Sequence, residues 1–298
     1  MKWNRNSTIF YIKLLIFFYT LLESLKNEVK MTNVARPLPF VLASTNTGTM
    51  ILNYLDRNQT QYGAYGVGYQ FLNTASFDKE EISNVIALLN LRREYFGDGV
   101  FALDCGANIG AHAIEWGIEM TGWGELIAFE AQERIYYALA GNIAINNCFN
   151  VRALNVALGN PKKKGGGETL EIPSLDYTKP ASFGSFELKQ SENREFIGQE
   201  PNFTKTQKVP LISIDSLKLE RVDLMKIDVE KMEMEVLKGA EATIKAHKPI
   251  LIIEIIKSNQ AEIVKLLESW EYQMFPMGMN ILAIHKNDPV LTRIVRNP

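Results

Sequence analysis

The stretch from Phe101 to Gly110 constrains the fold most, because an apolar run is followed directly by a glycine turn. Residues 99–103 are apolar and bounded by turn residues, which is typical of a buried strand in a parallel sheet. Gly106 and Gly110 bracket the turn, and the residues after it have helical apolar spacing. Glycine lets the backbone approach a bound molecule closely, and the first helical N–H groups can face an anion or a hydroxyl. The stretch therefore predicts a strand, a turn and a helix around a nucleotide-like ligand.

Two classes of ligand compete for this turn. A dinucleotide site requires G-x-G-x-x-G, whereas Gly106 and Gly110 stand alone with three residues between them. A second apolar run, 125–129, ends at Glu130, whose carboxylate can accept hydrogen bonds from both hydroxyls of a ribose. The alternative is that Glu130 only opens the next helix, where an acid is common. The spacing favours the ribose role.

The turn itself is similar to motif I of the S-adenosylmethionine (SAM) dependent methyltransferases, through its D-x-G-x-x-x-G form. This resemblance implies that the turn faces the methionine end of SAM and that Asp104 orients the amino group of the cofactor. The next predicted strand, 151–157, would end beside the adenine in a nucleotide fold, so Asn155 and Val156 are candidate adenine contacts. Ordinary strand-end residues are an equal alternative. The predicted cofactor-binding residues are Asp104, Gly106, Asn108, Gly110, Glu130 and Asn155.

Strand-like and helix-like segments alternate through most of the chain. This alternation predicts an α/β fold with a mostly parallel sheet and helices on both faces. Ligands of such sheets bind at the carboxyl ends of the strands. The predicted strands are 99–103, 125–130, 151–157, 222–230, 249–254 and 281–285, and the predicted helices are 109–116, 133–147, 232–247 and 261–270.

Residues 31–96 are predicted to form a β preface and a helix before this sheet. Short β-like runs occur at 50–54 and 67–71, separated by glycines and polar residues. Asp78 then opens a sequence typical of a capping box, and apolar residues follow at helical spacing.

Residues 159–210 contain no regular pattern and carry glycines, prolines and hydroxylic side chains. A connection this long inside a compact domain is usually functional or mobile. We therefore predict an acceptor-binding insertion within a domain that covers 97–298, with 181–185 as its ordered contact.

Three acids follow predicted strands, and we expect them to carry the chemistry. Asp228 and Glu230 come after one strand and Glu254 ends the next, so all three belong at the carboxyl edge of the sheet. Each can accept a hydrogen bond from a substrate hydroxyl and remove its proton. The alternatives are a helix cap near Met232, or a divalent cation held by the three carboxylates. We predict Asp228, Glu230 and Glu254 as catalytic residues with no required metal.

Several segments together resemble the signature of the FkbM-type methyltransferases, from about residue 99 to about residue 285. The resemblance implies a class I SAM-methyltransferase fold, which is Rossmann-like and doubly wound, with seven mostly parallel strands and an antiparallel last strand. Members of that family are SAM-dependent O-methyltransferases. The family usually has glycine after the acid of its Asp-x-Glu-Gly element, whereas Lys231 follows Glu230 here. The segments that carry the resemblance are 104–110, 214–217, 226–230, 233–240 and 249–254.

The resemblance implies transfer of a methyl group from SAM to a hydroxyl of a sugar or related small metabolite. One alternative is an NAD-dependent oxidoreductase, which the missing second glycine disfavours. Another is a non-catalytic nucleotide-binding module, which is disfavoured because unpaired carboxylates at strand ends are costly to keep. A net charge of −2 gives no basic excess, so we expect no nucleic-acid partner.

Residues 1–30 differ from the rest of the chain. The run 9–22 is strongly apolar, but Lys13 interrupts it and it is shorter than the roughly 20 residues that span a bilayer. No small-residue cleavage site of a signal peptide precedes Glu23. The segment is a helix on a membrane or on the domain, a marginal anchor, or an extension before a functional start at Met31, and we favour the first and the last. Two cysteines make no disulfide framework, so we expect a cytoplasmic enzyme with at most weak membrane association.

Overall fold

The chain divides into two units, and each is described by itself. The computed structural model describes residues 5–28, 36–61, 63–162, 167–189 and 194–294, and the units are Met1–Pro37 and Leu38–Pro298. The predicted functional start, Met31, lies outside the described residues.

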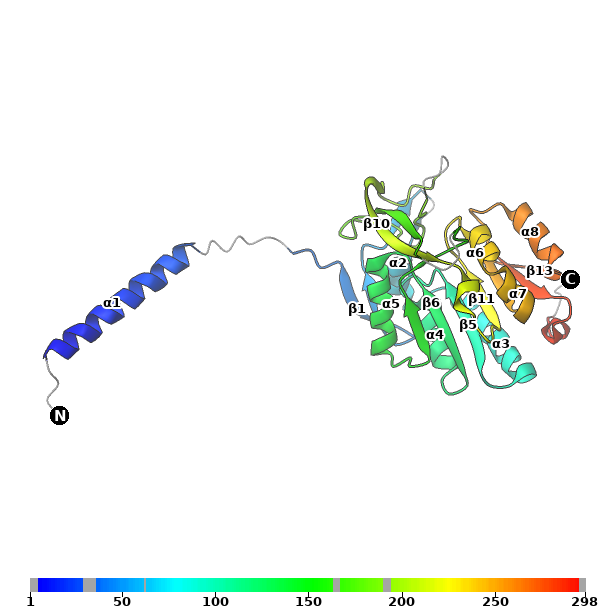
Figure 1. The fold of residues 1–298 in the computed structure, drawn as a ribbon, viewed down its shortest axis with the longest axis horizontal. Helices are drawn as coiled ribbons and strands as arrows, with labels where there is room; N and C mark the ends of the chain where they lie inside the picture. Colours follow the sequence, from blue (N-terminus) through cyan, green and yellow to red (C-terminus); the bar gives the residue numbers. More distant parts are fainter. Residues whose placement is uncertain (1–4, 29–35, 62, 163–166, 190–193, 295–298) are drawn as a thin grey trace. The chain divides into compact units, whose positions relative to one another are not determined.

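The first unit contains one helix, α1 (Arg5–Glu28), drawn in blue in Figure 1. Nearly all of its described side chains, at 13–24, are exposed, and the large apolar ones Leu15, Phe17 and Tyr19 are among them. Of the helices within the described residues, none has the length and apolar character that crossing a bilayer requires.

The second unit is built on a seven-stranded sheet with the order β13-β14-β12-β11-β5-β6-β7 (Figure 1). β5 pairs in parallel with β6 and β11, and β12 extends the parallel part beside β11. The last strand, β14, runs antiparallel to both of its neighbours, β12 and β13. The predicted doubly wound sheet with an antiparallel last strand is thus confirmed. The strands are β5 (Val100–Cys105), β6 (Gly124–Phe129), β7 (Val151–Leu154), β11 (Leu224–Ile227), β12 (Ile250–Glu254), β13 (Tyr272–Met277) and β14 (Asn280–His285).

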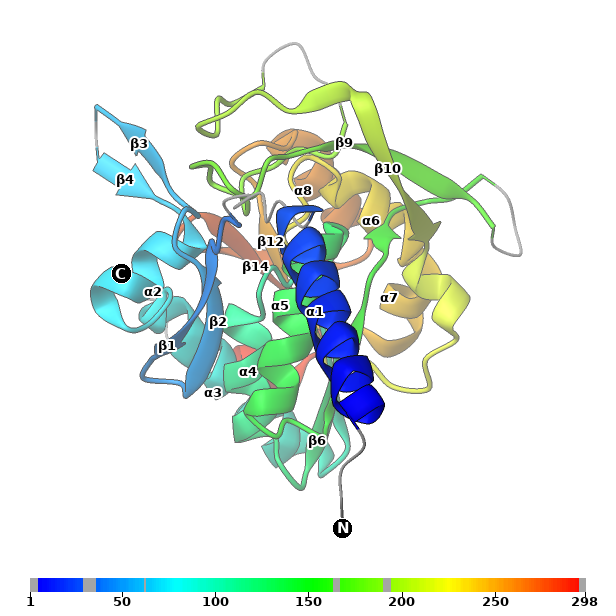
Figure 2. The ribbon, with the colours of Figure 1, turned by 90° about the vertical axis from the view of Figure 1, so that its left-hand side faces the viewer.

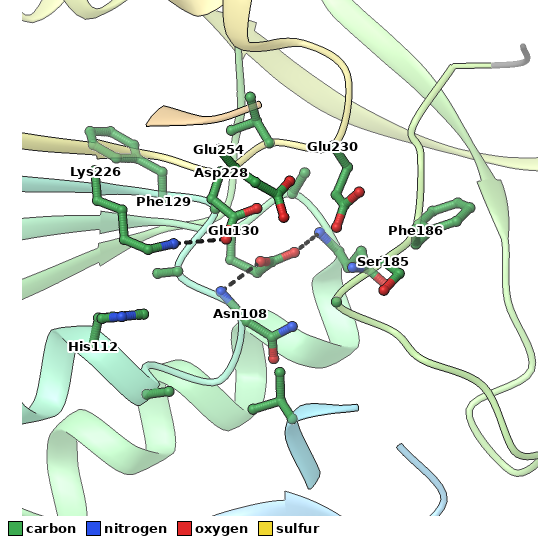
Figure 3. A pocket seen from close by; sticks show the side chains of 18 of the residues that line it. Asn108, His112, Phe129, Glu130, Ser185, Phe186, Lys226, Asp228, Glu230 and Glu254 are labelled. Atoms are coloured by element: carbon green, nitrogen blue, oxygen red, sulfur yellow. Dashed lines mark hydrogen bonds and ion pairs between the residues drawn. The ribbon is translucent and has the colours of Figure 1, made fainter. Parts of the chain in front are cut away.

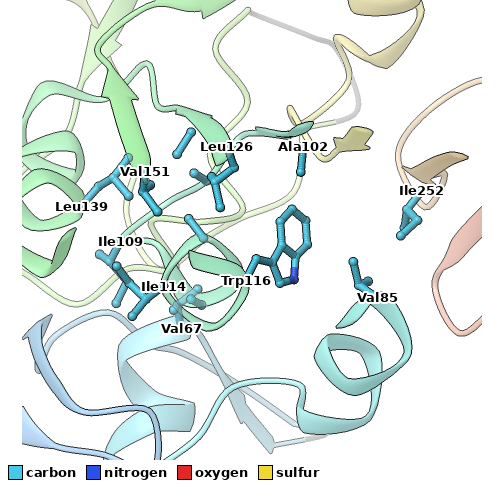
Figure 4. Packing of buried hydrophobic residues seen from close by; sticks show 14 of the residues in the cluster. Val67, Val85, Ala102, Ile109, Ile114, Trp116, Leu126, Leu139, Val151 and Ile252 are labelled. Carbon is cyan, nitrogen blue, oxygen red and sulfur yellow. The ribbon is translucent and has the colours of Figure 1, made fainter. Parts of the chain in front are cut away.

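Side chains alternate along each central strand and fill two separate hydrophobic cores. Ala102 and Leu126 pack in one core together with Trp116 (Figure 4), whereas Leu103 and Ile127 pack in the other. Because both faces are covered, these strands are near-continuous apolar runs. The first core is covered by α3 (Lys79–Phe96), α4 (Ala111–Glu119) and α5 (Glu133–Ile145), and the second by α6 (Glu233–Gly239), α7 (Glu241–His247) and α8 (Gln260–Ser269).

The N-terminal part of this unit corrects two predictions. The run 67–71 is not a strand but the start of a helix, because Val67 and Phe71 are one helical turn apart and both enter the first core. The predicted capping box also does not form, since Asp78 adopts a φ of 27° and its Oδ1 accepts from Gln70 Nε2 at 2.9 Å. The elements are β1 (Phe40–Ser44), β2 (Thr49–Asn53), β3 (Asn58–Thr60), β4 (Gly63–Tyr65) and α2 (Val67–Thr74).

The insertion is more regular than its sequence suggests. Two of its strands, β9 and β10, run side by side in Figure 2 and pair in antiparallel fashion, and β10 also pairs with β8. The predicted strand 151–157 therefore ends at Leu154, and its last residue begins β8 instead. These strands are β8 (Ala157–Leu158), β9 (Thr169–Ser174) and β10 (Asn202–Ile212).

The predicted helix 232–247 is two helices, α6 and α7, which meet at Gly239. A Cβ on Gly239 would lie 2.0 Å from the carbonyl oxygen of Gly159, so the chain is pressed against the start of the insertion here. Two short 3-10 helices, Ile214–Leu217 and Pro289–Thr292, complete the described elements.

Candidate functional site

A cavity of about 310 Å³ lies at the carboxyl ends of the parallel strands. Its walls come from the turn after β5, from the ends of β6, β11 and β12, and from 182–188 of the insertion (Figure 3). Each wall segment directly follows a strand of the sheet or covers it, so the topology places the cavity where ligands of α/β sheets bind.

The two glycines of the turn are required by close neighbours within the protein. Gly106 has a φ of 88°, and a Cβ there would lie 1.8 Å from the Asp228 carbonyl oxygen. Gly110 has a φ of 90° at the start of α4, where a Cβ would meet Leu139 at 2.8 Å. The freedom that the sequence analysis attributed to ligand approach is thus also used to pack the turn against the loop after β11, although Gly106 does line the cavity.

Glu130 lines the cavity and holds the loops on either side of it. Its Oε2 accepts a hydrogen bond from the backbone N–H of Asn108 at 3.0 Å, and its Oε1 accepts one from that of Gln132 at 2.7 Å. The side chain is buried, and burial raises the pKa of Glu130 to about 7 although both hydrogen bonds oppose the shift. A carboxylate has about four acceptor positions, so these two hydrogen bonds do not use all of them.

Three of the six predicted cofactor residues, Asp104, Gly110 and Asn155, do not line the cavity. Asp104 is 1 % exposed, and neither of its carboxylate oxygens has a hydrogen-bond partner among the described residues. Burial raises its pKa, and the neighbouring Lys226 opposes this shift. Asn155 donates from Nδ2 to the carbonyl oxygens of Glu130 (2.8 Å) and Ala131 (3.2 Å), so its side chain fixes the loop and leaves Val156 to line the cavity.

The three predicted catalytic acids come together. Asp228, Glu230 and Glu254 each offer an oxygen, and these oxygens all lie within 4.8 Å of one another (Figure 3). Burial, followed by the charge of Asp228, raises the pKa of Glu254 to about 7 and that of Glu230 well above its usual value. Glu254 can therefore take up or release a proton near neutral pH. Three carboxylate oxygens at this spacing can also hold a divalent cation, which is the alternative that the sequence leaves open.

Two lysines balance these acids, and the sequence analysis did not predict them. Lys226 Nζ lies 2.7 Å from Asp228 Oδ2, and Lys257 Nζ lies 2.7 Å from Glu230 Oε2. Burial alone would lower the pKa of Lys226, but Asp228 and Asp104 raise it above the ordinary range. A lysine inside the apolar run of β11 was a usable signal, because a buried strand carries a charge only when the charge is paired. Lys257 lies in a loop and gave no such signal.

Glu81 and His112 are further polar residues on the wall that the sequence did not single out. His112 Nε2 lies 3.2 Å from Glu81 Oε1, and Asn280 donates to the other oxygen of Glu81 at 2.9 Å. Glu81, His112 and Asn280 come from α3, α4 and β14, three separate elements of the chain. No local sequence pattern therefore predicts their contact.

Lys231 occupies the position at which the related family usually has glycine. Its φ is 73° and that of Glu230 is 53°, so both residues adopt the left-handed conformation that glycine takes at little cost. Lys231 Nζ lies 3.0 Å from Glu187 Oε1 of the insertion. Lysine in place of glycine therefore retains the left-handed turn and forms an ion pair with the insertion.

Comparisons with known proteins agree with this geometry. The family model described as the methyltransferase FkbM domain matches residues 104–274. A search of curated protein sequences gave no match.

Similar solved structures include three methyltransferases. The FkbM methyltransferase of Methylobacillus flagellatus KT aligns with 70% of this chain and 56% of its own length, at 17% identity and a TM-score of 0.42. The magnesium protoporphyrin IX methyltransferase of Synechocystis PCC 6803 aligns with 70% of this chain and 79% of its own, at 11% identity and a TM-score of 0.39. The tRNA (uracil-54, C5)-methyltransferase of Pyrococcus abyssi aligns with 83% of this chain and 44% of its own, at 13% identity and a TM-score of 0.36.

This chain thus spans little more than half the length of the first of these structures. The family match covers more than half of this chain, including the glycine turn and all three clustered acids. The chain therefore belongs to the methyltransferase FkbM family.

Proposed function

We propose that this protein is a SAM-dependent O-methyltransferase that acts on a hydroxyl of a sugar or related small metabolite. The observation that carries the proposal is a single cavity that is lined both by the glycine turn with Glu130 and by the three clustered acids. Donor and acceptor would then meet within one enclosed space, which is what positioning catalysis needs.

The residues on the donor side fit SAM, the cofactor of this family. The open acceptor positions of Glu130 suit the two hydroxyls of a ribose, and Val156 offers an apolar contact to an adenine. The buried carboxylate of Asp104 lies under the turn and accepts no hydrogen bond within the described residues, which suits a nearby cationic amino group. When bound, SAM supplies a methyl group that its sulfonium already activates.

On the acceptor side, the protein has to orient a hydroxyl and take its proton. We assign Asp228 as the acid nearest the transferred methyl, where its pairing with Lys226 keeps it oriented. Glu230 and Glu254, whose pKa values are raised, can hold the proton that the hydroxyl loses. No metal is required in this assignment.

The charges around this side support a neutral acceptor. Asp228, Glu230 and Glu254 line the cavity. Among the lysines that the structure describes, Lys226 alone lines the cavity with them. A phosphate backbone would approach these carboxylates without a basic surface to offset the repulsion. We therefore assign the insertion 159–210, which covers this side through 182–188, to binding a small uncharged acceptor.

Mass spectrometry of methyl transfer from isotope-labelled SAM to a panel of free sugars and sugar alcohols tests the acceptor class. Calorimetry with S-adenosylhomocysteine and with NAD tests the cofactor independently. Micromolar binding of S-adenosylhomocysteine and none of NAD is expected. Binding of NAD alone would contradict the proposal.

A further inference from the structure

Lys257 stands immediately behind the acceptor side of the cavity without lining it. It lies in the loop after β12, and its side chain is 15 % exposed. Its Nζ donates to Glu230 Oε2 at 2.7 Å and to the Ser185 carbonyl oxygen at 3.3 Å, and it lies 2.8 Å from Glu195 Oε2. An ammonium group has three hydrogens, so these three partners use all of them.

Two of these partners belong to the insertion, and the contacts continue from there to the N-terminal part of the domain. Tyr65 donates from its hydroxyl to Glu195 Oε1 at 2.6 Å. Asn58 donates from Nδ2 to the Tyr65 hydroxyl at 2.8 Å and to the Phe196 carbonyl oxygen at 2.7 Å. Lys257 thus connects the loop that carries Glu230 to the insertion and, through Glu195 and Tyr65, to the β3–β4 hairpin.

The contact with Lys257 leaves Glu230 one oxygen to use. Oε1 of Glu230 makes no hydrogen bond to any part of the chain that the structure describes, and Figure 3 shows this carboxylate among the cavity residues. A carboxylate that is 12 % exposed needs a partner of opposite charge to stay in one place, and Lys257 is that partner.

We propose that Lys257 is a positioning residue for methyl transfer. It fixes Glu230 through Oε2 so that Oε1 faces the acceptor hydroxyl, and it fastens the insertion over the acceptor through Ser185 and Glu195. The inference rests on the proposed function, because it needs Glu230 to receive the hydroxyl. Buried pairs of this kind act by holding geometry, whereas an exposed pair contributes little.

Three variants and a control separate the two parts of this role. Lys257→Met removes all three contacts, Lys257→Arg keeps a charged donor, and Glu195→Gln weakens only the link to the insertion. Lys245→Met is the control, since Lys245 pairs with Glu241 on the exposed surface of α7. Hydrogen exchange of 181–188 and 194–200 is measured first, together with calorimetry using S-adenosylhomocysteine.

Lys257→Met is expected to speed exchange in both segments at least tenfold and to leave the affinity for S-adenosylhomocysteine within about twofold, because local opening follows lost contacts. Lys257→Arg should restore most of the protection, and Lys245→Met should match the wild type. If Lys257→Met does not fold, Glu195→Gln carries the exchange test. Wild-type exchange in whichever variant is tested overturns the fastening role, whether or not any sugar is methylated.

Transfer of labelled methyl to the sugar panel then tests the link to Glu230. Lys257→Met should lower kcat at least tenfold, whereas Glu195→Gln should raise the KM for the sugar and change kcat little. An unchanged kcat in Lys257→Met overturns the positioning of Glu230. A wild-type protein that methylates no sugar overturns the proposed acceptor class instead, so the two proposals fail separately.

Discussion

Replacing Glu130 by glutamine is expected to weaken cofactor binding and to remove its dependence on pH. The carboxylate already accepts one backbone N–H on each oxygen, from Asn108 and from Gln132, and offers its remaining acceptor positions to the ribose. Glutamine has the same shape but one acceptor oxygen and no charge. The change therefore weakens the ligand contacts and also turns one of the two acceptors of a backbone N–H into a donor, while the side chain still fills its space.

The size of the effect follows from the raised pKa of Glu130, which is about 7. About a tenth of this group is ionised at pH 6 and about nine tenths at pH 8, so affinity should rise about tenfold between them if the ionised form receives the hydroxyls. Two hydrogen bonds to a charged acceptor stabilise a complex by about 2 kcal/mol more than two hydrogen bonds to a neutral acceptor. Glu130→Gln should therefore bind S-adenosylhomocysteine about thirtyfold more weakly at pH 8.

Calorimetry with S-adenosylhomocysteine at pH 6, 7 and 8 measures both effects. Glu254→Gln is a matched control, because Glu254 also lines the cavity with a pKa raised to about 7 but stands on the acceptor side. That variant should keep the tenfold dependence. Affinity that is the same at all three pH values in the wild type, or that still rises tenfold in Glu130→Gln, would refute the assignment of Glu130 to the ribose.

The other expectations concern the acids, the turn and the first unit. Asp228→Asn and Glu230→Gln should keep S-adenosylhomocysteine binding, and each should lower the rate of methyl transfer about a hundredfold, as loss of a positioned base does. Wild-type turnover in both variants would exclude these acids. The activity of the wild-type protein should survive EDTA. Gly106→Ala should lower the free energy of unfolding in denaturant by about 3 kcal/mol, because its Cβ would lie 1.8 Å from the Asp228 carbonyl oxygen. Gly97→Ala is the control. Gly97 has a φ of 75° and open space around it, so this change should lower the free energy of unfolding by about 1 kcal/mol. A chain that lacks residues 1–30 should still bind S-adenosylhomocysteine, and fractionation of both forms shows whether only the full chain sediments with membranes.

The sheet could be predicted because its central strands carry their own signal. The run from Val100 to Cys105 is apolar at almost every position since both faces of β5 are covered. The edge strand β13 escaped prediction because Gln273 and Pro276 interrupt its apolar pattern, and proline is tolerated only where a strand has a free edge or a bulge. Local sequence therefore predicted the middle of the sheet better than its border.

The acids of the site were predictable because each directly follows a strand, and the sheet brings strand ends together. Lys257 was not, because its partners lie far from it along the chain, Glu195 in the folded insertion and Glu230 in the loop after the neighbouring strand β11. The same holds for β9 and β10, whose pairing joins residues on either side of a long connection. Such contacts depend on tertiary packing that overrides local propensity.

The place of β14 has a consequence for synthesis of the chain. Of the seven strands of the sheet, β14 is the last to leave the ribosome, yet it lies between β12 and β13. Until residue 285 has emerged, β12 presents an unpaired apolar edge, which is the kind of surface on which nascent chains associate with one another. A chain that ends shortly before this strand would keep this edge unpaired and would tend to aggregate, and chaperone capture of nascent chains should be strongest in that window.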